Sequence, residues 1–111
     1  MIKTFEGAKL EIVLNIIYTL VGGEIKRIKY RKPVSALTGR WVATQKTPTS
    51  LAYTTIATDL DEPGIWEVQA YIEAGNTLRL YGEIARFEVL SHIPDAQESI
   101  DTGESGTVVI S

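Results

Sequence analysis

The sequence contains no cysteine and only one histidine, His92. Without cysteine the chain has no disulfide, no thiol nucleophile and no thiolate ligand for zinc or an iron–sulfur cluster. One histidine is too few for a zinc, iron or copper site, and His92 lies at the end of the last expected strand, next to Pro94, where a Ser-His-Asp arrangement is difficult to build. The composition therefore predicts a protein that is not an enzyme and has no resident metal or cofactor.

Long apolar runs are also missing. The most apolar stretch, residues 12–21, is interrupted by Asn15 and is shorter than the roughly 20 residues of a membrane helix. Glu6 and Glu11 occupy the region that a signal peptide keeps basic, and residues 22–24 do not form a cleavage site. We therefore expect neither a leader nor a membrane anchor.

What the 111 residues do contain, with 44% of them hydrophobic, suits one compact domain. Apolar and polar residues alternate with a period of two, turn-forming residues separate these segments, and no segment has a helical period. The pattern predicts an all-β fold, a single antiparallel β-sandwich of about seven strands. The expected strands are residues 9–16, 24–31, 40–44, 51–56, 65–73, 77–81 and 84–90.

The composition changes near Pro94, so we expect a domain over residues 1–93 and an acidic C-terminal tail over residues 94–111. The tail has four acidic residues, no basic residue and few apolar side chains to repay the entropy of ordering. We predict that residues 95–106 are mobile. Residues 107–110, Thr-Val-Val-Ile, have strand character, so pairing with a sheet edge is the alternative for that end of the tail.

The net charge of −3 argues against general nucleic-acid binding, which needs a basic face. The charge is unevenly distributed, however. Residues 1–46 hold nine Lys and Arg against three Glu, a balance of +6, whereas residues 47–111 hold two Arg against eleven acids, a balance of −9. Solvated strand faces explain such a division, and self-association of complementary surfaces is the alternative explanation.

The densest basic segment lies on one expected strand. Alternation places Arg27, Lys29 and Arg31 on one face, with Lys32 at the strand end. The row is interpreted either as a solvated strand face or as a binding site for an anionic partner, such as the acidic surface of another protein.

Aromatic residues offer a second candidate surface. Trp41 and Trp66 fall on strand faces with other apolar residues and are predicted to lie in the core. Tyr71 is predicted on the face opposite Trp66, so it is the best candidate for an exposed ring that stacks on a sugar.

Acidic residues gather before the Pro63-Gly64 turn. Asp59, Asp61 and Glu62 offer the oxygen ligands that calcium prefers, although the spacing of an EF-hand is absent. Contacts of these acids to the backbone of the turn are the alternative.

Several segments together resemble small immunoglobulin-like domains that phages and prophages encode in tail, baseplate and other virion proteins. The resemblance covers about residues 7–90, although the cysteine pair of antibody-type domains is absent. The segments that carry it are Gly22-Gly23-Glu24, Ile28-Lys29-Tyr30-Arg31-Lys32-Pro33, Gly39-Arg40-Trp41, Tyr53, Pro63-Gly64-Ile65-Trp66, Val68-Gln69-Ala70 and Phe87-Glu88-Val89.

This resemblance implies an immunoglobulin-like sandwich that acts as a non-catalytic structural or interaction module. Its partners would be other virion proteins or a second copy of the chain, and its location the virion or the bacterial cytoplasm. The partner-binding candidates are Arg27, Lys29, Arg31, Lys32 and Tyr71. A carbohydrate-binding accessory module with exposed aromatic rings is the alternative function.

Overall fold

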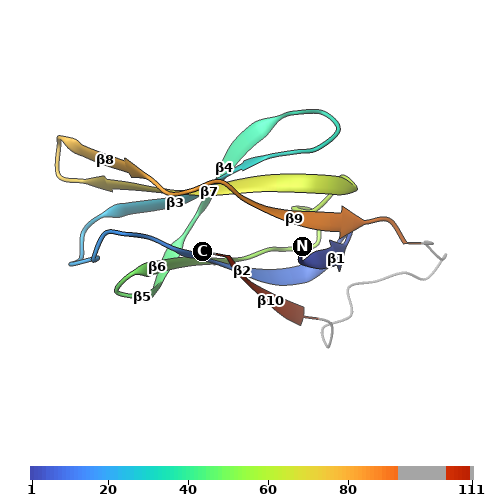
Figure 1. The fold of residues 1–111 in the computed structure, drawn as a ribbon, viewed down its shortest axis with the longest axis horizontal. Coiled ribbons are helices and arrows are strands. Elements are labelled where there is room, and N and C mark those ends of the chain that lie inside the picture. The colour runs from blue at the N-terminus through green and yellow to red at the C-terminus, as the bar shows by residue number, and fades with distance from the viewer. Residues whose placement is uncertain (93–104, 111) are drawn as a thin grey trace.

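The computed structural model of the chain describes residues 1–92 and the backbone of residues 105–110. Its regular structure is entirely β, with ten strands in two sheets (Figure 1). The strands are β1 (Lys3–Phe5), β2 (Lys9–Asn15), β3 (Ile25–Arg31), β4 (Thr38–Val42), β5 (Thr44–Thr47), β6 (Ser50–Thr54), β7 (Gly64–Ala74), β8 (Leu78–Tyr81), β9 (Ala85–Leu90) and β10 (Ser105–Ile110). Among these described residues, none forms a helix that could cross a bilayer.

The two sheets form the two layers of a sandwich (Figure 1). One sheet has six strands in the order β1-β9-β7-β3-β4, with β8 also paired to the long strand β7. The other sheet has the order β10-β2-β6-β5. The predicted all-β sandwich is confirmed at this level.

Two details of the predicted sandwich differ. The structure has ten strands rather than about seven, and two pairings, β1 with β9 and β10 with β2, are parallel. The expected strand at residues 40–44 is divided because the chain crosses there from one layer to the other. Buried Ala43 marks the crossing, and its amide donates a hydrogen bond to the carbonyl of Lys26 at 3.1 Å.

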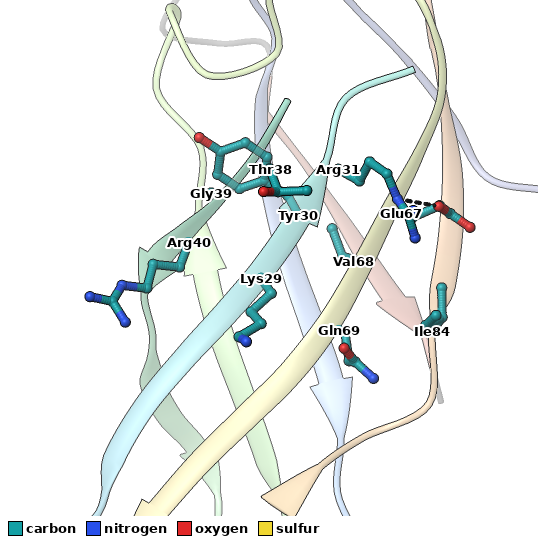
Figure 2. A pocket seen from close by; sticks show the side chains of 10 residues that line it. All are labelled: Lys29, Tyr30, Arg31, Thr38, Gly39, Arg40, Glu67, Val68, Gln69 and Ile84. Carbon is teal, nitrogen blue, oxygen red and sulfur yellow. Dashed lines mark ion pairs between the residues drawn. The ribbon is translucent and has the colours of Figure 1, made fainter. Parts of the chain in front are cut away.

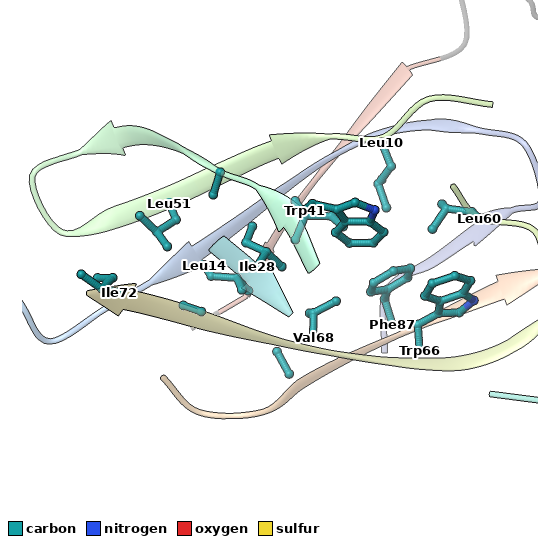
Figure 3. Close-up of a cluster of buried hydrophobic side chains, with 14 of the residues drawn as sticks. Leu10, Leu14, Ile28, Trp41, Leu51, Leu60, Trp66, Val68, Ile72 and Phe87 are labelled. Carbon is teal, nitrogen blue, oxygen red and sulfur yellow. The ribbon is translucent and has the colours of Figure 1, made fainter. Parts of the chain in front are cut away.

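The core lies between the layers and is built around aromatic rings (Figure 3). Trp66 and Phe87 are fully buried, with ring centroids 6.3 Å apart. Trp41 is also buried and stacks between Tyr30 at 4.5 Å and Tyr53 at 4.8 Å. The predicted core positions of Trp41 and Trp66 are therefore confirmed.

Two glycines make room for this packing. A Cβ atom at Gly39 would lie within 3 Å of the Tyr30 ring, which crosses that position to reach Trp41. Gly64 has a φ of 124° and lies against Pro33, so a side chain there would be both strained and obstructed. Gly64 thus keeps the start of β7 close to the end of β3.

The C-terminal segment takes part in the sandwich. β10 pairs parallel with β2 in a continuous register, from Ser105 opposite Lys9 to Ile110 opposite Leu14. The alternative of an edge strand at residues 107–110 is confirmed, and β10 begins earlier than expected, at Ser105. Residues 93–104, where most of the tail expected to be mobile falls, lie outside the described residues.

Candidate functional site

The basic row of β3 lies on the outer face of the six-stranded sheet. Ile28 is fully buried and Tyr30 packs against the core, so Arg27, Lys29 and Arg31 project away from it. β3 pairs with β7 in an unbroken register over residues 25–31, which leaves no bulge. The predicted basic row is therefore on the surface of the sheet, where a partner can reach it.

Part of the predicted cluster is neutralised within the chain. Arg31 Nε lies 2.9 Å from Glu67 Oε1, and Arg86 Nη2 lies 2.9 Å from Glu67 Oε2, so one carboxylate joins β3, β7 and β9. Lys32 Nζ lies 2.9 Å from Asp61 Oδ2, and this hydrogen bond raises the pKa of Lys32. Arg31 and Lys32 are therefore occupied by internal partners.

The remaining cations of this face have no carboxylate within ion-pair distance among the described residues. Lys29 lies directly opposite Arg40 of β4 in the strand register. Arg27, one pair along on the same face, donates only to the carbonyl of Lys26, at 2.9 Å. Like charges directly opposite each other destabilise a sheet. The structure therefore gathers three cations, Arg27, Lys29 and Arg40, on one face without a carboxylate partner among the described residues.

A groove of about 400 Å³ opens beside Lys29 and Arg40 on the outer face (Figure 2). Lys29 and Arg40 supply positive charge, Thr38 a hydroxyl and Ile84, which is 44% exposed, an apolar wall. The other residues that line it are Tyr30, Arg31, Gly39, Glu67, Val68 and Gln69. This mixture suits an anionic group presented by a larger surface, and it provides no nucleophile paired with a base.

Tyr71, predicted to be exposed, is buried, with 6% of its surface accessible. β8 folds back onto β7 so that Tyr81 lies opposite Tyr71, and the two ring centroids are 5.0 Å apart. Lys29 Nζ lies over both rings, at 4.8 Å from Tyr71 and 4.9 Å from Tyr81. The prediction is wrong because the partner strand covers this ring, and Tyr81, 54% exposed, is the accessible aromatic residue.

Arg40 and Tyr81 belong to this surface but are not among the candidates predicted from the sequence. A sequence pattern indicates each of them. Arg40 precedes the core residue Trp41, so alternation places its side chain on the outer face. Tyr81 would have followed from pairing the expected strand 77–81 with β7 in register, since it then falls opposite Tyr71.

The acidic residues before β7 have partners within the chain. Asp59 accepts hydrogen bonds from the Tyr53 hydroxyl at 2.7 Å and from the amide of Ile56 at 2.9 Å. Asp61 forms the ion pair with Lys32. The pKa of Tyr53 is raised, mainly because the hydroxyl is buried and to a lesser degree because it donates a hydrogen bond to Asp59.

Glu62 binds the loop between β3 and β4. It accepts hydrogen bonds from the amides of Val34 and Ser35 at 3.0 Å each and from the Ser35 hydroxyl at 2.7 Å. The Ser35 hydroxyl is the main cause of the lowered pKa of Glu62. Asp59 and Glu62 therefore accept hydrogen bonds from backbone amides, as the alternative expects, but these amides lie outside the Pro63-Gly64 turn, and Asp61 instead pairs with Lys32. The described part of the chain contains no group of three side chains placed to hold a metal ion.

No family model, curated protein or solved structure matches this chain.

Proposed function

We propose that this protein is a non-catalytic interaction module with an immunoglobulin-like sandwich, and that it is a tail, baseplate or decoration component of a phage or prophage particle. In that role it is found in the virion or in the cytoplasm of the bacterium before assembly. The resemblance of residues 7–90 to virion domains supports this setting.

The strand order supports the immunoglobulin-like comparison. Immunoglobulin sheets place the second, fifth and fourth strands together, and the third, sixth and seventh strands in the facing sheet. Here β4 and β8 are additional strands, so β5, β6, β7 and β9 take the places of the fourth, fifth, sixth and seventh strands. β2, β6 and β5 are then neighbours in one layer, and β3, β7 and β9 are neighbours in the other. At the start of β7, Trp66 Nε1 donates to the carbonyl of Glu62 at 2.9 Å. This contact occupies the place of the tyrosine corner, where a ring near the start of the sixth strand bonds back to the preceding backbone.

One observation carries the proposed binding site: Lys29 and Arg40 lie directly opposite each other with no acidic neighbour that pairs with them in the described structure. Such a pair opposes folding slightly and attracts an anionic partner. We place the acidic surface of a neighbouring particle protein, or of a second copy, on this groove. Its carboxylates would meet Lys29 and Arg40 while its apolar rim contacts Ile84.

Charge reversal in the full chain tests this function. Lys29→Glu and Arg40→Glu should each strongly reduce the amount of protein that co-purifies with particles banded in a density gradient. Lys3→Glu is the matched control, because Lys3 lies on β1 at the opposite edge of the same sheet, 3.9 Å from Glu88. Equal incorporation of all three variants, or absence of the unchanged protein from particles, would contradict the proposal.

A carbohydrate-binding module stays as the second candidate, supported by the exposed Tyr81 ring beside Lys29. Tyr81 replaces Tyr71 as the residue that would stack on a sugar. Glycan-array binding that disappears in Tyr81→Ala and survives in Lys3→Glu would favour this function over the particle module.

A further inference from the structure

The open position beside β2 is filled by the strand that is farthest from it in sequence. β2 pairs with β6 on one side, and on the other side β10 is the one strand among the described residues that covers its edge. The N-terminal strand β1 pairs with β9 in the other sheet. Without β10, the row of backbone groups from Lys9 to Leu14 would lie open at the edge of the sheet, next to buried Leu10, Ile12 and Leu14.

The connection to β10 is much longer than the path within one molecule requires. Leu90, the end of β9, lies opposite Phe5, and Ser105, the start of β10, lies opposite Lys9. Phe5 and Lys9 are four residues apart, across a turn closed by the hydrogen bond from Ala8 to Phe5. Leu90 and Ser105 are therefore at most about 24 Å apart, counting about 14 Å of chain and two strand spacings.

Fourteen residues, 91–104, lie between the end of β9 at Leu90 and the start of β10 at Ser105. Fully extended, this connection spans roughly 50 Å, about twice the distance it must cover. Apart from its pairing with β2, β10 has no strand partner among the described residues. The same β10 is therefore able to reach and pair with the β2 of an adjacent molecule.

We propose that the edge of β2 is a strand-acceptor site, through which copies of this chain link by giving β10 of one molecule to β2 of the next. The exchanged pair keeps every backbone contact of the internal one, as in domain swapping. Even with this long connection, the internal β10 stays at an effective concentration of about the millimolar range. Exchange should therefore dominate where copies are held together at such concentrations, and the internal pairing should dominate in dilute solution.

The absence of native cysteine allows a direct test in the full chain. Glu11 and Thr107 are register partners, so cysteines at these positions come within disulfide distance only when β10 pairs with β2. Glu11→Cys protein is mixed with Thr107→Cys protein, oxidised at protein concentrations from about 10 µM to 1 mM, and the disulfides are mapped by mass spectrometry. We expect a mixed dimer, with position 11 of one variant bonded to position 107 of the other, whose yield rises with concentration.

The control replaces Glu11→Cys with Lys9→Cys, whose register partner is Ser105 and not Thr107. The Cα atoms of positions 9 and 107 are then beyond the roughly 7 Å that a disulfide allows, and we expect about tenfold less mixed dimer. Equal yields from both mixtures, or no mixed dimer at any concentration, would overturn strand exchange.

A chain carrying both Glu11→Cys and Thr107→Cys checks the site itself. In dilute solution it should close an internal disulfide and stay monomeric. Failure to close would show that β10 does not pair with β2 in this register and would overturn the proposed acceptor site. Because β2 belongs to the four-stranded sheet, this test is independent of Lys29 and Arg40, and either proposal can fail without the other.

Discussion

The outer face of the six-stranded sheet has two halves with similar side chains and different electrostatics. Toward β9, Arg31 and Arg86 share the carboxylate of Glu67 at 2.9 Å each. Toward β4, Lys29 and Arg40 are opposite each other in the strand register and have no acidic partner among the described residues. In the first half both arginines have a carboxylate partner within the fold, whereas in the second half the described part of the chain offers Lys29 and Arg40 none.

The position of each half in the sheet explains the difference. Glu67 lies on β7, which has neighbours on both sides, so one acid reaches two arginines. β4 is the edge strand, and the described sheet has no strand beyond it to supply a carboxylate. Among the described residues no strand beyond β4 supplies a counter-charge for Arg40, and the proposed interface is built on this observation.

The largest effect is expected from a change in the core beneath both halves of the sheet. Trp66→Ala should lower the free energy of unfolding by about 3–5 kcal/mol, because a fully buried ring is lost from the centre of the core. Urea denaturation measures it. Ile65→Ala, at a neighbouring outer-face position that is 45% exposed, is the control and should cost much less. A decrease in the free energy of unfolding of less than about 1 kcal/mol for Trp66→Ala would contradict a central place for this ring in the core.

A smaller effect should separate the halves. Glu67→Gln leaves Arg31 and Arg86 without their shared carboxylate and should reduce the free energy of unfolding by roughly 1 kcal/mol, since the pair is partly exposed. Glu73→Gln on the same strand is the matched control, because its contact with Arg79 is 3.9 Å long. Equal effects in urea denaturation would show that the shared carboxylate has no special role.

The alternation of apolar and polar residues predicts which side chains face the core, but it does not predict which strands become neighbours. It placed Trp41 and Trp66 inside and the basic row of β3 outside, because side chains alternate strictly along a strand. It did not show that Ala43 carries the chain from one layer to the other. That crossing depends on which strands become neighbours, and the local pattern carries no information about distant neighbours.

The candidate site shows the same limit. The charges of Arg31 and Lys29 are identical in the sequence, yet of the two only Arg31 has an acid within the described structure, because Glu67 lies far along the chain and meets it through strand pairing. Tyr71 was misplaced for the same reason, since Tyr81 covers it from the next strand. Face is a local property, whereas exposure and charge balance depend on cross-strand partners.

A third prediction concerns the loop that joins β3 to β4 and so borders the cationic half. The Ser35 hydroxyl and the backbone amides lower the pKa of Glu62, so its ionised form stabilises the loop. This contribution is complete above the ordinary value of 4.5 and is lost as the pH falls through the lower value in the folded protein. The amide chemical shifts of Val34 and Ser35 should therefore titrate with a midpoint below 4.5. Glu62→Gln should abolish that transition, and a midpoint at or above 4.5 would contradict it.

The smallest expected change in stability concerns the half of the outer face that holds Lys29 and Arg40. Arg40→Glu places a carboxylate opposite Lys29, so an attractive pair replaces a repulsive one. The free energy of unfolding should rise by roughly 0.2–1 kcal/mol, more at low salt than at high salt. Arg40→Gln should give an intermediate gain, because it removes the repulsion without adding an attraction. Thermal unfolding at two salt concentrations resolves this order. If Arg40→Glu is instead destabilising at low salt, Lys29 and Arg40 do not repel each other, and the idea that the fold retains this pair for an outside partner fails with it.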